Sequence, residues 1–239
     1  MTAHSPQVSI VIPTYNERHG IAGLIDGIID RFEAAGIDGE IVVVDDNSPD
    51  GTWQICEELG QTRPVRVLRR AGKLGLSSAV IDGFGCARGT ILGVMDADGS
   101  HDPAALPQLI DAIARDDYDL AVGSRYISGG QIKDWPLIRL IISKGAVLLA
   151  SPLTPIRDIT SGYFFMKRNV IDGVKLNPIG FKIGLEVFVK GRFTRYCEVP
   201  YTFVNRVEGK SKLTLKQMWE YVVQLFDLIR FRLFRRTSR

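Results

Sequence analysis

Apolar residues in the first half of the chain follow two alternating patterns. Short runs rich in Val, Ile and Leu predict strands, and stretches with apolar residues every three or four positions predict amphipathic helices. The predicted strands cover residues 8–12, 40–44, 65–68, 90–95 and 118–123, and the predicted helices cover residues 21–35, 52–59, 76–87 and 103–115. This alternation predicts an α/β fold, with a mostly parallel sheet and helices on both of its faces.

Polar side chains collect where the predicted strands end. Pro13 to Glu17 follow the first strand, Asp45 and Asp46 follow the second, and Asp96 and Asp98 follow the fourth. Ligands of open α/β sheets bind at the carboxyl ends of the strands. Three polar clusters at three strand ends therefore predict one shared crevice, which turn preferences alone do not explain.

Asp96 and Asp98 form an Asp-x-Asp pair after the apolar run 91–94. Mg²⁺ takes oxygen ligands and usually binds one or two carboxylates together with substrate phosphates. The pair therefore predicts a divalent-cation site that holds a diphosphate. The alternative interpretation is that both residues shape a turn or cap a helix.

The second half has a different pattern. Residues 136–149 predict an apolar helix in which Arg139 and Ser143, four positions apart, share one face. This face is either an anion site, since guanidinium matches phosphate oxygens, or simply a place where an arginine reaches solvent. Residues 205–212 form a basic loop, which either folds over phosphates or is an ordinary surface loop.

The last segment combines apolar and basic residues. Residues 213–234 predict an amphipathic helix, and five arginines occupy positions 230–239. We expect residues 1–212 to form the main domain and residues 213–239 to form a helix and tail. Aromatic plus basic side chains favour a membrane interface, and packing on the domain as a plain terminal helix is the alternative.

Composition argues against a nucleic-acid-binding protein, a disulfide-rich secreted protein and a membrane-spanning protein. The 239 residues carry a net charge of only +3, and no motif indicates a nucleic-acid partner. The three cysteines are far apart, which argues against a disulfide framework and favours a reducing cytoplasm. The polar first seven residues do not resemble a signal peptide, and no apolar stretch is long enough to span a membrane.

Four ordered motifs resemble those of a known family. They are Pro13-Thr-Tyr-Asn-Glu17, Val44-Asp-Asp-Asn-Ser-Pro-Asp-Gly-Thr52, Met95-Asp-Ala-Asp98 and Gly123-Ser-Arg-Tyr126. Together they resemble family 2 glycosyltransferases of GT-A fold, in the branch of dolichyl-phosphate (polyprenyl-phosphate) mannose synthases. The resemblance extends over residues 7–212.

The resemblance implies a role for each matching residue. The nucleotide pocket would contain Pro13, Tyr15, Glu17, Val44 and Asp46, with Asp96 and Ala97 against the nucleotide sugar. Mg²⁺ or Mn²⁺ would be held mainly by Asp98, with Asp96 and Ser100; the Ser100 hydroxyl is short enough that a water could intervene. The acceptor's phosphate would be held by Arg125, Arg139 and Ser143, and the donor's diphosphate and sugar by Lys182, Arg206 and Lys212.

The implied reaction is inverting transfer of mannose from GDP-mannose to the phosphate of a dolichyl or polyprenyl phosphate. The implied place is the cytoplasmic face of a membrane, where the protein is peripheral. Many relatives carry transmembrane helices after this region, whereas this sequence stops at Arg239. The resemblance leaves two alternatives: a natural soluble form that works with a small membrane-protein partner, or a shortened chain.

Three rival functions are distinguishable. A UDP-glucose-dependent polyprenyl-phosphate glucosyltransferase would keep the fold and change the donor. A non-catalytic nucleotide-sugar-binding subunit is disfavoured because Asp96 and Asp98 are intact. A nucleotidyltransferase would carry a glycine-rich phosphate loop after the first strand, where this chain has Pro13 to Glu17.

Overall fold

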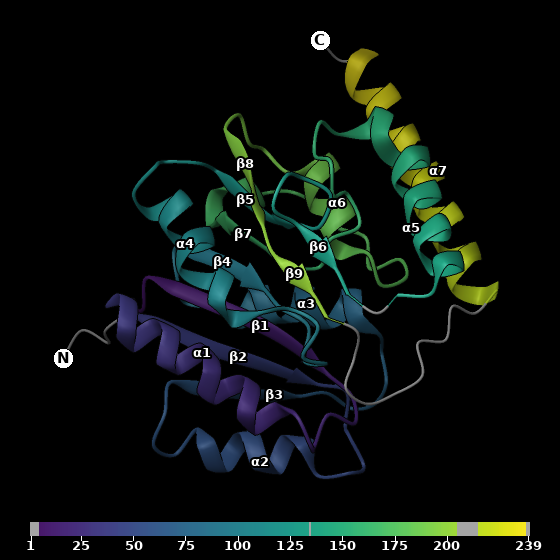
Figure 1. Ribbon diagram of the computed structural model, residues 1–239. Helices are drawn as coiled ribbons and strands as arrows, with labels where there is room; N and C mark the ends of the chain where they lie inside the picture. The colour runs from purple at the N-terminus through teal and green to yellow at the C-terminus, as the bar shows by residue number, and fades with distance from the viewer. Residues whose placement is uncertain (1–4, 134, 205–214, 238–239) are drawn as a thin grey trace.

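The computed structural model describes residues 5–133, 135–204 and 215–237 (Figure 1). Its main sheet has seven strands in the order β3-β2-β1-β4-β7-β5-β8. They are β1 (Val8–Thr14), β2 (Gly39–Asp45), β3 (Val65–Arg69), β4 (Ile91–Val94), β5 (Leu120–Ser124), β7 (Phe164–Lys167) and β8 (Tyr196–Pro200). Strand β7 runs antiparallel to its neighbours β4 and β5, and every other pairing is parallel. The prediction of a mostly parallel sheet is therefore confirmed.

Helices cover both faces of this sheet. They are α1 (Ile21–Ala35), α2 (Thr52–Leu59), α3 (Leu76–Cys86), α4 (Leu106–Ala114), α5 (Leu137–Ala150), α6 (Ile183–Lys190) and α7 (Leu215–Thr237). Short 3-10 helices occupy Pro103–Ala105, Ser151–Leu153 and Arg168–Val170. The predicted helix over 103–115 is thus a 3-10 turn, capped by the Asp102 carboxylate on the Ala104 N–H, followed by α4.

Strands β1 and β2 are buried on both faces of the sheet. Their side chains therefore pack into two hydrophobic cores, one on each face. Ile10 and Ile12 pack with α1, α2 and α4, whereas Val11 packs with α3 and α6 on the other face. Strands covered on both sides read as continuous apolar runs, because neither face meets water. This explains why the first two strands are visible in the sequence without polar alternation.

Helices α5 and α7 lie side by side at one edge of the molecule (Figure 1). The Tyr221 hydroxyl donates to the Ala146 carbonyl at 2.6 Å, and Leu225 and Leu228 join a small third core with Leu185 of α6. Large apolar side chains remain exposed on both helices, including Leu137, Ile141 and Leu148 on α5 and Trp219, Phe226 and Phe234 on α7. None of the described helices has the length and apolar composition needed to cross a membrane.

A second, two-stranded sheet pairs β6 (Gln131–Ile132) with β9 (Thr202–Phe203) in parallel. Its register places Gln131 beside Thr202 and Ile132 beside Phe203. Since β6 follows β5 and β9 follows β8, this sheet extends the β5–β8 pairing beyond the carboxyl edge of the main sheet. It brings Trp135 and Phe203 into contact, with ring centroids 5.2 Å apart.

Candidate active site

The loops after β1 and β2 are joined by hydrogen bonds around the buried Asp45 carboxylate. Asp45 is 0% exposed and accepts from the Thr14 hydroxyl at 2.8 Å and the Ser48 hydroxyl at 2.6 Å. The Ser48 hydroxyl in turn accepts from the Asn16 N–H at 3.0 Å. These partners lie within the two loops, so Asp45 fixes their spacing and leaves its neighbour Asp46 to face the crevice.

Asp50 and Thr52 form a second link between the same loops. The Thr52 hydroxyl accepts from the Glu17 N–H at 3.0 Å, and the Asp50 carboxylate accepts from the Thr52 N–H and hydroxyl. Burial raises the pKa of Asp50, but the Thr52 hydrogen bonds outweigh it and the pKa is lowered overall. Asp50 therefore stays ionised near neutral pH and holds the turn that carries Glu17.

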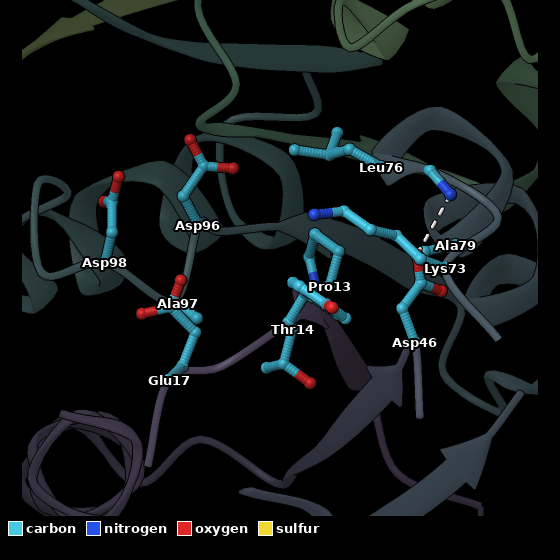
Figure 2. A pocket seen from close by; sticks show the side chains of 12 residues that line it. Pro13, Thr14, Glu17, Asp46, Lys73, Leu76, Ala79, Asp96, Ala97 and Asp98 are labelled. Atoms are coloured by element: carbon cyan, nitrogen blue, oxygen red, sulfur yellow. Dashed lines mark hydrogen bonds between the residues drawn. The ribbon is translucent and has the colours of Figure 1, made fainter. Parts of the chain in front are cut away.

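A cavity of about 200 Å³ lies at the carboxyl ends of β1, β2 and β4 (Figure 2). Its lining residues are Pro13, Thr14, Tyr15, Glu17, Asp46, Lys73, Gly75, Leu76, Ala79, Asp96, Ala97 and Asp98. The set includes seven of the predicted nucleotide-sugar residues, which the structure therefore brings together. Figure 2 shows Asp96 and Asp98 along one side of the cavity and Asp46 on the other.

Val44 does not line this cavity. Its side chain is 0% exposed and packs in the core formed with Val11, Val80 and Phe84. Successive side chains of a strand point to opposite faces of the sheet, and that of Val44 on β2 points to the face covered by α3. A contact of Val44 with a nucleotide would thus have to come from its backbone.

Asp46 is backed by a buried arginine. The Arg70 Nε donates to Asp46 Oδ1 at 2.6 Å, its Nη2 also contacts that oxygen, and the Gly75 N–H donates to Oδ2 at 2.9 Å. The Arg70 Nη2 also donates to the Gly75 carbonyl at 2.8 Å. This ring of contacts ties the ends of β2 and β3 to the start of α3.

Lys73 reaches into the cavity from the loop between β3 and α3. Its Nζ lies 3.8 Å from the centre of the Tyr15 ring, a distance typical of a cation–π contact. Lys73 is the only lysine or arginine among the residues that line the described cavity, where Glu17, Asp46, Asp96 and Asp98 supply carboxylates. Sequence reasoning missed both Lys73 and Arg70, because no motif singles out the loop after β3.

The Asp96 and Asp98 pair lies on the turn after β4, and Gly99 with a φ of +73° shapes this turn. Asp98 Oδ1 accepts from the Ser100 N–H at 3.1 Å. The Ser100 Oγ is buried without a hydrogen-bond partner among the described residues. These neighbouring oxygens fit a hard divalent cation that takes its remaining ligands from phosphate and water. Within the described part of the chain no group of three His, Cys, Asp or Glu side chains forms a self-contained metal site.

The buried His101 side chain packs against the turn that carries Asp96 and Asp98 and accepts a hydrogen bond from its backbone. It is 2% exposed, its Nδ1 accepts from the Asp96 N–H at 3.0 Å, and its ring stacks on Tyr163 at 4.9 Å. Burial, together with the nearby Arg125 and Lys182 charges, outweighs the attraction of Asp98 and lowers the pKa of His101 to about 3. The imidazole is neutral at pH 7, so it orients the Asp96 backbone rather than titrating there.

The predicted acceptor residues meet around Trp135. The Arg139 guanidinium lies 4.1 Å from the centre of the Trp135 ring, and the Arg125 guanidinium lies 5.6 Å from it. The Ser143 and Tyr126 hydroxyls share a hydrogen bond of 2.8 Å, which connects α5 to the loop after β5. The structure thus brings Arg125, Arg139 and Ser143 into one cluster, although they come from two separate elements.

Arg125 is more deeply buried than its predicted role alone requires. It is 7% exposed, and its Nε and Nη2 donate to the two oxygens of Asp158 at 2.8 and 2.7 Å. Burial lowers the pKa of Arg125, but the Asp158 carboxylate outweighs this and raises it overall. Arg125 is therefore permanently charged and rigidly held by a partner that the sequence did not indicate.

Lys182 lies between these two regions. Its Nζ donates to the Thr160 carbonyl at 3.0 Å. Burial and the positive charge of Arg125 lower the pKa of Lys182 to about 8, although Asp96 and Asp158 act in the opposite direction. Two other predicted donor residues, Arg206 and Lys212, lie outside the described residues.

Comparisons with known proteins indicate one family. Residues 9–174 match the family described as Glycosyl transferase family 2. The chain is 45% identical over 229 residues to a dolichol-phosphate mannosyltransferase from Pyrococcus furiosus, in a match that covers 94% of the chain and 64% of that relative. It is 39% identical over 241 residues to a dolichol-phosphate mannosyltransferase from Mycosarcoma maydis, in a match that covers 97% of the chain and 82% of the relative.

A solved structure supports the fold. A mannosyltransferase from Pyrobaculum calidifontis, determined in complex with GDP-Man and Mn²⁺, superposes with a TM-score of 0.63 at 20% identity, over 95% of this chain and 65% of that one. This likeness confirms the predicted GT-A-type α/β architecture. Taken with the family match and the two sequence relatives, it leads to one conclusion: the chain belongs to glycosyl transferase family 2.

Proposed function

We propose that the protein transfers mannose from GDP-mannose to the phosphate of a polyprenyl or dolichyl phosphate. The observation that carries this proposal is the pairing of two unlike sites at one sheet edge. A carboxylate-lined cavity suits a nucleotide sugar with a divalent cation, and a separate arginine cluster suits the phosphate of an acceptor. The names of the sequence relatives support the choice of sugar and acceptor.

The donor would bind with its nucleoside between Pro13, Tyr15 and Asp46 and its diphosphate near Asp96 and Asp98. Mg²⁺ or Mn²⁺, when bound there, would neutralise charge that develops on the departing diphosphate. Lys182, Arg206 and Lys212 would add positive charge to the diphosphate and sugar. We propose these roles on the basis of the family's motifs and of the cavity's lining residues.

The proposed nucleophile is an oxygen of the acceptor's phosphate. It forms a bond to C1 of mannose while the bond from C1 to the diphosphate oxygen breaks, and the electron pair leaves with GDP. A phosphate oxygen is already anionic near neutral pH, so no general base has to remove a proton. This suits a site in which His101 is buried and neutral. A single displacement inverts C1 and gives a β-linked product from an α-linked donor.

The acceptor's phosphate must approach a second anionic group, so electrostatic repulsion is the main obstacle. Arg125 and Arg139 would offset this repulsion, and the Ser143 hydroxyl would add a neutral hydrogen bond. Such prearranged charges act without reorganising during the reaction, which makes them effective in partly buried sites. In this proposal, catalysis comes from positioning and charge rather than from proton transfer.

A lipid acceptor implies contact with a membrane surface. The exposed apolar side chains of α5 and α7 and the arginines near the C-terminus support peripheral binding at the cytoplasmic face. Co-sedimentation with anionic and with neutral vesicles tests this. Binding that prefers anionic vesicles and weakens with salt is expected, and equal binding to both would contradict the electrostatic part. A small membrane-protein partner remains part of the proposal.

The direct test is transfer of radiolabelled mannose from GDP-mannose to a short polyprenyl phosphate, with Mg²⁺, with Mn²⁺ and with EDTA. Metal-dependent lipid-linked product supports the proposal. Tight GDP-mannose binding without product would indicate a missing partner or another acceptor, or a non-catalytic subunit. Failure to bind GDP-mannose, with binding of UDP-glucose instead, would favour the glucosyltransferase alternative.

A further inference from the structure

The segment from Asp158 to Gly162 contacts three parts of the site at once. Asp158 binds Arg125, Thr160 binds both Arg125 and Lys182, and Gly162 lies against Asp96. A Cβ added at Gly162 would come within 3.3 Å of the Asp96 carboxylate. The segment thus touches the predicted acceptor, donor and metal residues, although neither the four motifs quoted from the sequence nor the cavity lining includes it.

Asp158 holds Arg125 through a planar clamp. Asp158 Oδ2 accepts from the Arg125 N–H at 2.9 Å and from Nε at 2.8 Å, and Oδ1 accepts from Nη2 at 2.7 Å. The second Nη2 hydrogen bond goes to the Thr160 hydroxyl at 2.9 Å. Among the described residues Nη1 has no hydrogen-bond partner, so the clamp leaves one end of the guanidinium for a ligand. The Tyr126, Trp135 and Phe203 rings lie between 5.3 and 5.6 Å from the guanidinium carbon.

Asp158 is itself fixed from behind. Its side chain is 0% exposed, and its backbone N–H donates to Glu198 Oε1 at 3.0 Å. The other Glu198 oxygen accepts from the Arg157 N–H at 3.1 Å. Glu198 lies on β8, which pairs with β5, the strand that leads directly to Arg125. The carboxylate and the arginine are therefore anchored to adjacent strands, and neither has to be ordered when a ligand binds.

Thr160 connects the two cationic residues. Its hydroxyl accepts from Arg125 at 2.9 Å, and its carbonyl accepts from Lys182 at 3.0 Å. Ser161 fixes the same turn by donating to the Gly123 carbonyl at 2.7 Å. One rigid turn thus sets the spacing between Arg125 and Lys182, which the proposed function assigns to the acceptor and to the donor.

We propose that Asp158 is a positioning residue that aims the Nη1 end of Arg125 at the acceptor's phosphate, and that the turn 158–162 sets the distance between acceptor and donor. This inference rests on the proposed function, because it needs an acceptor that carries a phosphate. Asp158 acts only through Arg125, and Thr160 acts through both Arg125 and Lys182. Neither residue touches the reacting atoms.

The test measures acceptor KM, kcat and GDP affinity in D158N and T160V. The amide introduced by D158N would turn an N–H donor toward the guanidinium, so Arg125 loses its fixed orientation. We expect kcat/KM for the acceptor to fall roughly 100-fold in D158N, the scale of loss caused by misplaced groups. T160V keeps the carbonyl that binds Lys182 and removes one hydrogen bond to Arg125, so a loss of about tenfold is expected. GDP affinity should be unchanged in both.

E40Q provides the matched control. Glu40 is 1% exposed and binds the Arg88 Nε and Nη2 at 2.9 and 2.7 Å, but it lies near the start of β2, at the opposite edge of the sheet.

The inference is supported if E40Q loses thermal stability as D158N does and keeps the acceptor KM of the wild type. It is overturned if D158N and T160V keep that KM, or if GDP affinity and acceptor KM worsen together. Wild-type protein that makes no lipid product would overturn the proposed function instead. If D158N does not fold, T160V decides.

Discussion

The donor half of the site, around the cavity, and the acceptor half, around Trp135, each contain a buried arginine–aspartate pair. The two pairs are arranged in opposite ways relative to the site. In the Asp46–Arg70 pair the carboxylate lines the cavity and the arginine stands behind it. In the Arg125–Asp158 pair the arginine is the predicted ligand-binding group and the carboxylate stands behind it. Each pair satisfies a buried charge, which would otherwise be costly to bury.

The difference follows from the ligands that each half is proposed to bind. A nucleoside presents hydroxyl and N–H donors, which a carboxylate accepts, whereas a phosphate presents oxygens, which a guanidinium fork matches. The partner behind each functional group holds it in one orientation. The two halves of the site therefore use the same kind of ion pair with its ends exchanged.

The largest effect is expected from D98A, which removes a donor-side carboxylate. Transfer should fall on the order of 1,000-fold, the upper range for loss of one group that stabilises developing charge. The measurement is labelled-mannose transfer in the presence of Mn²⁺. D102A, which removes only the cap on the Ala104 N–H, serves as control. Near-normal turnover of D98A in saturating Mn²⁺ would contradict the metal assignment.

R70M tests the arginine behind the donor half. Asp46 would lose its ion pair, and breaking a buried pair costs about 3–5 kcal/mol of unfolding free energy. GDP affinity should also fall, because the Gly75 carbonyl loses its donor and the loop that carries Lys73 is released. Chemical denaturation and calorimetry measure the two effects. R88M removes the closer of the two arginines that contact the distant Glu40 and leaves Arg66 at 3.5 Å, so it should lose stability alone. Equal loss of GDP binding in both variants would refute the local role.

R139A tests the acceptor half from helix α5, where Arg139 lies over the Trp135 ring. Loss of a charge-assisted hydrogen bond costs about 2 kcal/mol, so acceptor KM should rise roughly 30-fold while GDP affinity stays constant. Steady-state kinetics with a short polyprenyl phosphate and calorimetry with GDP provide the two numbers. K144A, on the exposed side of the same helix, is the control. A comparable loss of GDP binding in R139A would show that the two halves are not separate.

The smallest effect is a pH dependence that arises where the halves meet. Lys182 has a pKa lowered to about 8, so it loses its charge as pH rises through 8 in the ligand-free protein. GDP affinity should therefore fall about tenfold between pH 7 and pH 9. Because this pKa is depressed below the ordinary lysine value of 10.5, burial of the charged amine destabilises the fold at pH 7, and this cost is relieved between pH 8 and 10.5. K182R, whose guanidinium stays charged, should bind GDP equally at both pH values; a fall as large as that of the wild type would contradict the assignment.

The first half of the fold is well predicted because its signals are local. The predicted helix over 52–59 matches α2 (Thr52–Leu59), and the predicted strand over 65–68 matches β3 (Val65–Arg69) within one residue. In this half each buried strand is followed by an amphipathic helix. The spacing of the apolar residues and the turn residues between elements therefore indicate where each strand and helix ends. The same regularity explains why seven predicted donor residues line one cavity.

The second half lacks such signals. All eight residues of α6 (Ile183–Lys190) are buried, including the ion-paired Glu186 and Lys190. The helix therefore has no exposed face, and its sequence lacks the amphipathic period that predicts a surface helix. Strand β7 (Phe164–Lys167) has only four residues, and it runs antiparallel between β4 and β5, which a simple alternation of strands and helices does not indicate. The turn with Asp158 and Thr160 directly precedes β7, and Lys182 directly precedes α6, so these three residues lie where local signals are missing.

The sequence by itself determined that polar groups after β1, β2 and β4 share one edge, because parallel strands joined by helices must end on the same side. Only the tertiary structure decided which of these groups face the cavity, because Asp45 turned out to be a loop anchor and Val44 a core residue. It also decided how Arg125 is held, since the partner Asp158 lies 33 positions away along the chain. Contacts between distant segments depend on strand order and chain reversal, which no local pattern of residues encodes.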